Sequence, residues 1–181
     1  MKTNIVIPMK APNISKTRLG PFFSSVQRQR LAVKMFESTL IFFSQHFPNY
    51  HVLVVTSSVI ISRIAEKHGA TVLIERTPGL NQAATSGAVW STNHGFDSQL
   101  LIPADIARLD VEEMKTLLSA KRALPSVLLV PAEDHGTNAL LTTPPDAIEF
   151  SYGINSSMTH EQATVMQSID FQSIALPHLA L

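Results

Sequence analysis

The chain has 181 residues, 45% of them hydrophobic, with no cysteine and a formal net charge of zero. This length suits a single domain with a full hydrophobic core. The absence of cysteine excludes disulfides, thiolate zinc sites and cysteine nucleophiles. No apolar run approaches the length of a membrane span, and the apolar stretch in MKTNIVIPMK is too short for a signal peptide. We therefore expect a cytoplasmic protein that makes no contact with a membrane.

Basic side chains are concentrated at the start of the chain. Seven of the fourteen lysines and arginines precede the first acidic residue, Glu37. A local basic patch in a neutral protein favours a small anionic ligand over a nucleic acid, which usually meets a domain that is basic throughout. The alternative interpretation is a solvated basic helix face, chiefly for Arg28, Arg30 and Lys34.

Apolar runs and helical periodicity alternate along the chain. The pattern predicts strands at 4–8, 51–57, 71–75, 99–103 and 126–131, and helices at 25–46, 59–68, 80–94 and 111–122. After 131 the alternation breaks: GTNALLTTPP predicts a further strand and NSSMTHEQATVM a further helix. This order predicts an α/β fold of three layers (α/β/α), a mostly parallel sheet with helices on both faces, in one domain over residues 1–181.

Polar motifs follow the predicted strands. A loop with Lys10, Lys16 and Arg18 follows the first strand, RTPGLNQA follows 71–75, ADIARLD follows 99–103, and AEDHGTN follows 126–131. Ligands of open parallel sheets bind beyond the carboxyl ends of the strands. The shared edge of these motifs therefore predicts a binding site there.

The first two motifs have features that suit an anion. Lys16 and Arg18 are two residues apart, so in an extended loop both side chains can point to the same side, although a solvated loop is the alternative. Pro78-Gly79 predicts a turn before a helix whose N-terminus, with Asn81 in its first turn, attracts an anion or a polar nucleotide edge. A plain strand-to-helix turn is the alternative there.

The later motifs offer oxygen ligands and hydrogen-bond donors. A carboxylate directly after a buried strand suits Mg²⁺, which favours Asp105 as a metal ligand, and Asp110 is interpreted as a helix cap. Thr137 and Asn138 offer donors after the turn at Gly136. Asn155 or Ser156 can cap the following helix, or its exposed N–H groups can bind an anion, and the lone His160 is more often structural than catalytic.

The motifs together resemble those of the 2-phospho-L-lactate guanylyltransferase family, whose members attach GMP to a small phosphorylated acid in making the deazaflavin coenzyme F-420. The segments that carry the resemblance are IPMKAPNISKTRLGP, PGLNQA, PADI, GTNALL and YGINSSMTH, in that order between residue 4 and about residue 165. The resemblance implies a Rossmann-like fold of the nucleotide-diphospho-sugar transferase type.

The resemblance also implies roles for individual residues. GTP would lie against Pro8, Lys10, Lys16, Arg18, Gly79 and Asn81, and the acceptor acid against Thr137, Asn138, Gly153 and Ser156. Asp105 would hold Mg²⁺, and Lys16, Arg18 and Asp105 would be the catalytic residues. The acceptor's phosphate oxygen would attack the α-phosphorus of GTP and displace pyrophosphate, with 2-phospho-L-lactate, phosphoenolpyruvate or 3-phosphoglycerate as acceptor.

The C-terminus departs from the family pattern. The family continues with an LDIDxPxDL-like segment whose acid is expected to supply a second metal ligand, whereas this chain has ALPHLAL, so Glu75 is the substitute that the sequence offers. Two alternatives therefore stay open: a non-catalytic nucleotide-binding protein of the same fold, and a related nucleotidyltransferase with another acceptor. The apolar stretch IALPHLAL is also a candidate surface for a homodimer.

Overall fold

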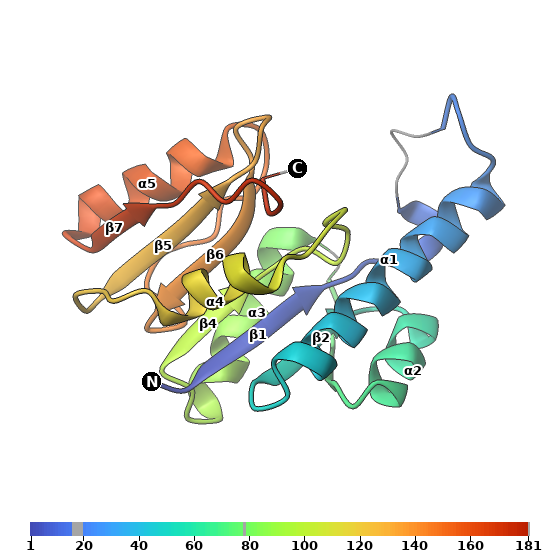
Figure 1. Ribbon diagram of the computed structural model, residues 1–181, viewed down its shortest axis with the longest axis horizontal. Coiled ribbons are helices and arrows are strands. Elements are labelled where there is room, and N and C mark those ends of the chain that lie inside the picture. The colour runs from blue at the N-terminus through green and yellow to red at the C-terminus, as the bar shows by residue number, and fades with distance from the viewer. Residues whose placement is uncertain (16–19, 78, 181) are drawn as a thin grey trace.

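The computed structural model describes residues 1–15, 20–77 and 79–180. One seven-stranded sheet forms its centre, and Figure 1 shows helices packed over both faces. The strands are β1 (Thr3–Pro8), β2 (His51–Thr56), β3 (Thr71–Ile74), β4 (Ser98–Leu101), β5 (Ser126–Pro131), β6 (Thr137–Thr143) and β7 (Asp170–Ser173). The helices are η1 (Pro12–Ile14), α1 (Ser25–His46), α2 (Val59–Lys67), α3 (Leu80–Asn93), α4 (Val111–Ser119) and α5 (Ser156–Gln167).

The strand order is β3-β2-β1-β4-β6-β5-β7, and β6 alone among the described strands runs against its neighbours. The carboxyl ends of β1 to β5 therefore share one edge of the sheet with the amino end of β6. This confirms the prediction of a mostly parallel sheet whose polar motifs meet at one edge.

The two faces of the sheet are covered by different helices. Alternate side chains of β1 supply both cores: Ile5 and Ile7 pack with residues of α1, α2 and α4, and Val6 packs with residues of α3. Such alternation is the ordinary consequence of strand geometry. The partly buried Ala163 brings α5 onto the same face as α3. The three-layer prediction is therefore confirmed.

The sequence missed β7 and misplaced some boundaries. Strand β7 reads DFQS, is short and only partly buried, and pairs with β5 in parallel at the edge of the sheet. The strand predicted to end at 103 ends at Leu101, although the Ile102 amide still donates to the Val6 carbonyl at 3.1 Å. The helix predicted to end at 122 ends at Ser119, because Ala120 takes an extended ψ of 128°.

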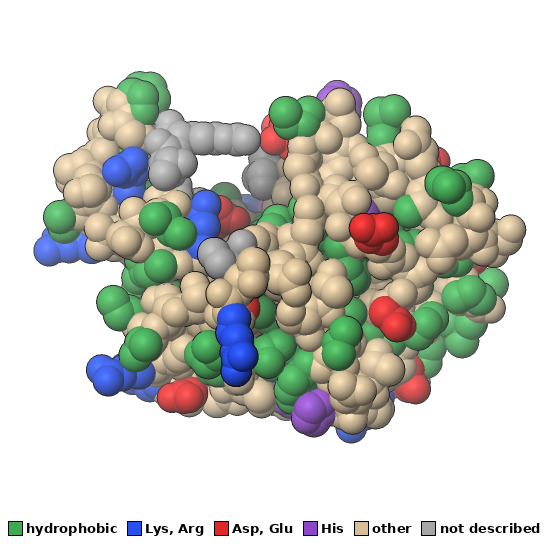
Figure 2. Space-filling view, turned by 180° about the vertical axis from the view of Figure 1, so that it is seen from behind, with side chains coloured by type: hydrophobic (Ala, Val, Ile, Leu, Met, Phe, Trp, Pro, Cys, Tyr) green, Lys and Arg blue, Asp and Glu red, His purple; other side chains and the backbone are tan. Residues whose placement is uncertain are grey.

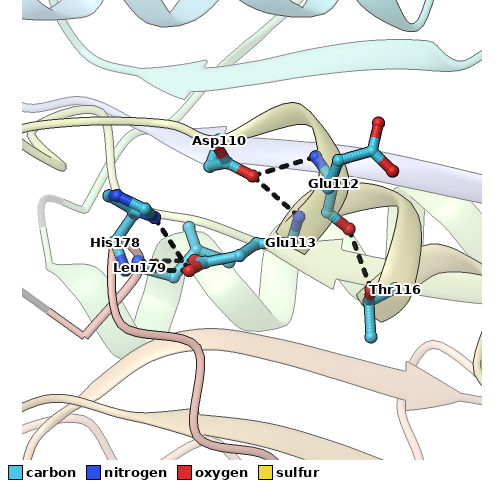
Figure 3. A network of polar contacts seen from close by, with 6 residues as sticks. All are labelled: Asp110, Glu112, Glu113, Thr116, His178 and Leu179. Atoms are coloured by element: carbon cyan, nitrogen blue, oxygen red, sulfur yellow. Dashed lines mark hydrogen bonds and ion pairs between the residues drawn. The ribbon is translucent and has the colours of Figure 1, made fainter.

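The C-terminal segment after β7 packs back into the molecule. Leu176 and Leu179 are buried in the core that α1, α2 and α4 share, with exposed fractions of 7% and 0%. Figure 3 shows the Glu113 carboxylate of α4 receiving this segment: it accepts from the His178 amide at 3.0 Å, the His178 ring at 2.9 Å and the Leu179 amide at 3.1 Å. Two of the apolar side chains that suggested a homodimer surface, Leu176 and Leu179, therefore lie in the chain's own core, and the homodimer stays a prediction.

Helix α4 begins as predicted. Asp110 is its N-cap and accepts from the amides of Glu112 and Glu113 at 3.0 and 3.1 Å, drawn in Figure 3. Both contacts favour the ionised carboxylate, and they hold the pKa of Asp110 below its usual value. Among the described helices, none has the length and apolar character needed to cross a membrane.

Candidate active site

A cavity of about 490 Å³ opens at the edge of the sheet where β1, β3 and β4 end. The described residues that line it come from the segments after these strands and from helices α1 and α3. Five predicted site residues are among them: Pro8, Lys10, Glu75, Gly79 and Asp105. The predicted nucleotide and metal residues of three separate motifs therefore meet in one place. Lys16 and Arg18 lie outside the described residues, so their predicted roles stay predictions.

Much of the cavity wall is apolar. Met9, Ile14, Leu80 and Ala83 contribute to it. Pockets for planar organic ligands are typically apolar with a few polar groups that fix orientation. The Lys10 ammonium and the carboxylates of Glu75 and Asp105 are the charged side chains among the described lining residues. This arrangement suits a ligand with one flat apolar part and one anionic part.

Helix α3 begins at this cavity. Gly79 is its N-cap with φ of 157°, a backbone conformation that residues with a side chain rarely adopt. Nothing lies closer than 3.9 Å to a Cβ built there, so conformation rather than lack of space accounts for the glycine. Among the described residues no side chain caps the first turn, so this positive end of the helix dipole lies at the cavity without a capping carboxylate or hydroxyl from them.

Asp105 lies four residues beyond the end of β4, in an exposed turn. The adjacent Ala104 carbonyl accepts a hydrogen bond from Thr39 of α1 at 3.5 Å, which ties this turn to the helix layer. A hard carboxylate oxygen at a cavity that the Lys10 ammonium also lines fits Mg²⁺, which often uses one or two carboxylates together with substrate phosphates. The described residues hold no cluster of three or more metal-ligating side chains, so phosphate and water oxygens would complete the coordination.

Glu75 follows β3, and its amide donates to the Thr56 carbonyl of β2 at 3.0 Å. Its carboxylate oxygen Oε2 is buried and accepts no hydrogen bond from the part of the chain that the structure describes. Burial raises the pKa of the Glu75 carboxyl above its ordinary value, because the charged form loses water. A buried carboxylate oxygen without a partner is costly, so this atom calls for an explanation.

Asn81 joins the cavity to the loop before α5. It accepts from the Tyr152 amide at 2.6 Å and donates to the Tyr152 carbonyl at 3.4 Å. Its side-chain amide is therefore engaged with the protein backbone at both ends. The prediction that Asn81 lies beside the nucleoside stays a prediction, while its structural role is to couple two motifs that are 71 residues apart.

Thr137, Ser156 and His160 form a buried polar network beyond that loop. The Ser151 amide donates to His160 Nε2 at 3.0 Å, so the ring proton lies on Nδ1, which donates to Thr137 Oγ1 at 3.1 Å. The Thr137 and Ser156 hydroxyls share a hydrogen bond at 3.0 Å, in which either oxygen can be the donor.

Burial supports this neutral state of the histidine. His160 has an exposed fraction of 0%, and desolvation lowers its pKa to about 4. The prediction that His160 is a structural histidine is confirmed.

An irregularity in the sheet determines which face Asn138 and Thr137 each meet. The register between β5 and β6 shifts at Val130/Pro131, which leaves Asn138 as an extra residue on β6. Asn138 donates to the Leu179 carbonyl at 2.8 Å, toward the C-terminal segment, while Thr137 faces α5. The two predicted acceptor residues are therefore adjacent in sequence but engaged on opposite faces.

The prediction that Asn155 caps α5 is confirmed in position but not in side-chain bonding. Asn155 occupies the N-cap position in a left-handed conformation, but its side chain makes no capping bond. The first amides of the helix are already used: Ser156 donates to Gly153, Ser157 to His135 and Met158 to Asn155. The exposed Gly153, with φ of 151°, and the buried Ser156 belong to the tight turn that begins the helix, and their role in binding the acceptor stays a prediction.

Basic and acidic residues are concentrated in different halves of the sequence. The first 90 residues carry ten basic and three acidic side chains, and the remaining 91 carry four basic and eleven acidic ones. β1 belongs to the basic half and β4 to the acidic half, and the two strands are neighbours in the sheet. The boundary between the two halves therefore lies between these strands and passes through the cavity. On the face that Figure 2 shows, most of the visible basic side chains lie toward the left and most of the visible acidic ones toward the right.

Sequence reasoning missed Tyr152, Ser151 and the full role of His160. The spacing between Tyr152 and His160 is the available signal, since both lie in YGINSSMTH, and their rings meet at 4.9 Å in an edge-to-face contact. The C-terminal attachment through Glu113 carried no sequence signal, because its partners are mostly backbone amides.

Comparison with known proteins agrees with this geometry. The chain is 60% identical over 181 residues to a 3-phospho-D-glycerate guanylyltransferase of Colwellia psychrerythraea, covering 100% of this chain and 86% of that protein. It is 28% identical to a phosphoenolpyruvate guanylyltransferase of Roseiflexus, covering 99% and 79%. A nucleotide-diphospho-sugar transferase structure from Desulfovibrio desulfuricans superimposes with a TM-score of 0.71 at 13% identity, over 97% of this chain and 80% of that one, which shows a shared fold.

The family model that matches this chain is described as guanylyl transferase CofC like, and its match covers residues 3–172. That range includes β1 to β6, all of β7 except its last residue, and all the motifs gathered at the sheet edge. The chain belongs to the CofC-like guanylyl transferase family.

Proposed function

We propose that this protein transfers GMP from GTP to a small phosphorylated acid and releases pyrophosphate. The observation that carries the proposal is the single cavity where Lys10 and Asp105 meet the uncapped first turn of α3. The relatives named above act, by their names, on 3-phospho-D-glycerate and phosphoenolpyruvate. Of these acids, 3-phosphoglycerate is our first choice of acceptor because that relative is the more similar; 2-phospho-L-lactate stays a candidate. A role in coenzyme F-420 biosynthesis follows from the family.

The reaction needs no nucleophile from the protein. A phosphate oxygen of the acceptor attacks the α-phosphorus of GTP, a new P–O bond forms, and the bond to the β-phosphate oxygen breaks. The electron pair and the negative charge leave with pyrophosphate. The protein's contribution is therefore position and charge, which agrees with the lack of a Ser/His/Asp arrangement in the sequence.

Different residues would neutralise charge and hold the substrates in position. Lys10 lies where it would neutralise phosphate charge, and the sequence predicts that Lys16 and Arg18 add to it. Asp105 would hold Mg²⁺, which supplies further charge neutralisation when bound. Asn81 fixes the loop around Tyr152, so the cavity and the predicted acceptor residues Thr137, Gly153 and Ser156 keep a constant relation.

The test is pyrophosphate release from GTP with Mg²⁺ and each of the three acids. We expect release with at least one acid, and loss of at least about 100-fold in kcat when Asp105 is changed to Asn, because a charged group near developing charge is removed. Asp146→Asn is the matched control, since Asp146 is exposed near the end of β6, at the opposite edge of the sheet. Nucleotide binding without release with any acid would favour the non-catalytic alternative.

A further inference from the structure

The unpartnered oxygen of Glu75 is the least expected polar atom of the cavity. Neither the lysine that shares the cavity nor any other described side chain donates to Oε2. Buried polar groups are nearly always hydrogen-bonded in proteins, and each exception calls for an explanation, of which a functional role is one. A carboxylate has only acceptors, so the missing partner must present N–H or O–H groups or be a cation.

The position of Glu75 separates it from the metal end of the cavity. Glu75 follows β3 and Asp105 follows β4, with β2 and β1 between them in the sheet. At the usual strand spacing these two strand ends are about 14 Å apart. Asp105 and Glu75 therefore lie toward opposite ends of the cavity, and the apolar residues Met9 and Leu80 also contribute to its wall.

We propose that the Glu75 carboxylate selects the guanine base, accepting hydrogen bonds from guanine N1–H and the 2-amino group. The proposal rests on the proposed function, because it assigns the base end of the same nucleotide site. It replaces the sequence-based expectation that Glu75 is a second metal ligand.

The chemistry of the bases explains why a carboxylate would discriminate. Guanine presents two neighbouring donors, N1–H and the 2-amino group, which match the two oxygens of one carboxylate. Adenine presents an acceptor at N1, cytosine an acceptor at N3, and uracil a single donor between two acceptors. Each of these would leave the half-buried Glu75 carboxylate unpaired or facing another acceptor, and a site built to hydrogen-bond one ligand rejects analogues that lack the partner groups.

Base analogues test the proposal on the unaltered protein. Inosine nucleotides lack only the 2-amino group, so they remove one charge-assisted hydrogen bond. We expect ITP to be used, or IDP to be bound, about 10- to 100-fold less well than the guanine nucleotide. Binding of GDP, IDP and XDP by calorimetry measures base selection without turnover, so this test remains valid even where pyrophosphate release fails.

The decisive variant is Glu75→Gln. The new amide keeps one acceptor for N1–H but places a donor where the 2-amino group binds, which matches the 2-carbonyl of xanthine. We expect guanine nucleotides to lose about 100-fold in affinity or kcat/KM, and the preference to move toward xanthine nucleotides. Glu66→Gln, on the exposed surface of α2, is the matched control and should keep the original base preference.

The outcomes are distinct. Equal binding of GDP and IDP by the unaltered protein would overturn the proposal. So would an unchanged base preference in Glu75→Gln accompanied by a higher Mg²⁺ requirement, which would identify Glu75 as a metal ligand. If Glu75→Gln does not fold, the analogue series on the unaltered protein decides. Absence of pyrophosphate release together with selective GDP binding would contradict the proposed transfer reaction and leave base selection by Glu75 supported.

Discussion

The buried His160 side chain connects a loop and a strand by hydrogen bonds. Its ring accepts from one backbone amide and donates to one hydroxyl, so only the neutral form with the proton on Nδ1 satisfies both contacts. The sequence predicted a structural histidine here but not its partners. Those partners come from the Ser151 backbone and from β6, and local patterns do not reveal such contacts.

This histidine makes stability depend on pH. The pKa of His160 is about 4 in the folded protein, against the ordinary histidine value of 6.5 in the unfolded chain. Below pH 6.5 the unfolded chain binds a proton that the folded chain excludes, so this contribution is complete above pH 6.5 and falls as the pH drops toward 4. Between about pH 7.5 and about pH 5 the loss is about 2 kcal/mol.

Urea unfolding of the natural chain and of His160→Gln at these two pH values checks this. The variant should be less stable overall but should lose about 2 kcal/mol less between about pH 7.5 and about pH 5. His51, whose pKa burial also lowers, is present in both proteins and cancels in the comparison. Equal pH dependence of the two proteins would show that His160 does not titrate in this way.

Elements with strong apolar patterns were predicted almost to the residue. Helix α1 was expected at 25–46 and is found there, begun by a capping box in which Ser24 and Gln27 bond reciprocally. In contrast, β7 is polar, four residues long and at the sheet edge, so its pairing with β5 rather than its own residues makes it a strand. The same limit applies to the segment after β7, which is fixed by Glu113.

The attachment of this segment predicts a large difference between two adjacent glutamates. Glu113→Ala removes three hydrogen bonds and leaves the amides of His178 and Leu179 without their acceptor, so we expect a loss of about 2–4 kcal/mol in the free energy of unfolding. Glu112 is 78% exposed in its side chain and pairs with Lys115 alone, so Glu112→Ala should cost less than about 1 kcal/mol. Urea midpoints measure both, and similar costs would contradict the attachment.

At the scale of the whole molecule, the sequence predicted the fold class and the sheet edge that carries the site. Five predicted residues line the cavity because strand ends in a parallel sheet converge regardless of loop detail. The predicted acceptor residues could not be placed as well, since the face that each of Thr137 and Asn138 meets depends on a register shift that no apolar pattern encodes.

The division of charge across the sheet predicts salt-dependent nucleotide binding. The ten basic side chains of the first 90 residues produce a field that attracts a triphosphate, and dissolved ions screen that field. We expect the Kd for GTP to rise several-fold between about 0.05 and 0.5 M KCl. Guanosine, which has the same base but no phosphate, should bind with nearly constant affinity; a parallel change for both ligands would assign the salt effect to the base site or to the fold.

Asn138 is an extra residue on β6. The number of residues between β5 and β6 therefore determines which side chain of β6 faces α5. Removing one residue there would restore regular pairing and exchange the directions of the two side chains, because successive strand residues point to opposite faces. Asn138 would then meet His160, and Thr137 would meet the C-terminal segment. A relative that is one residue shorter between 131 and 138 could still align with this chain at Thr137 and Asn138. In that relative, however, the side chain that faces α5 would be the one aligned with Asn138.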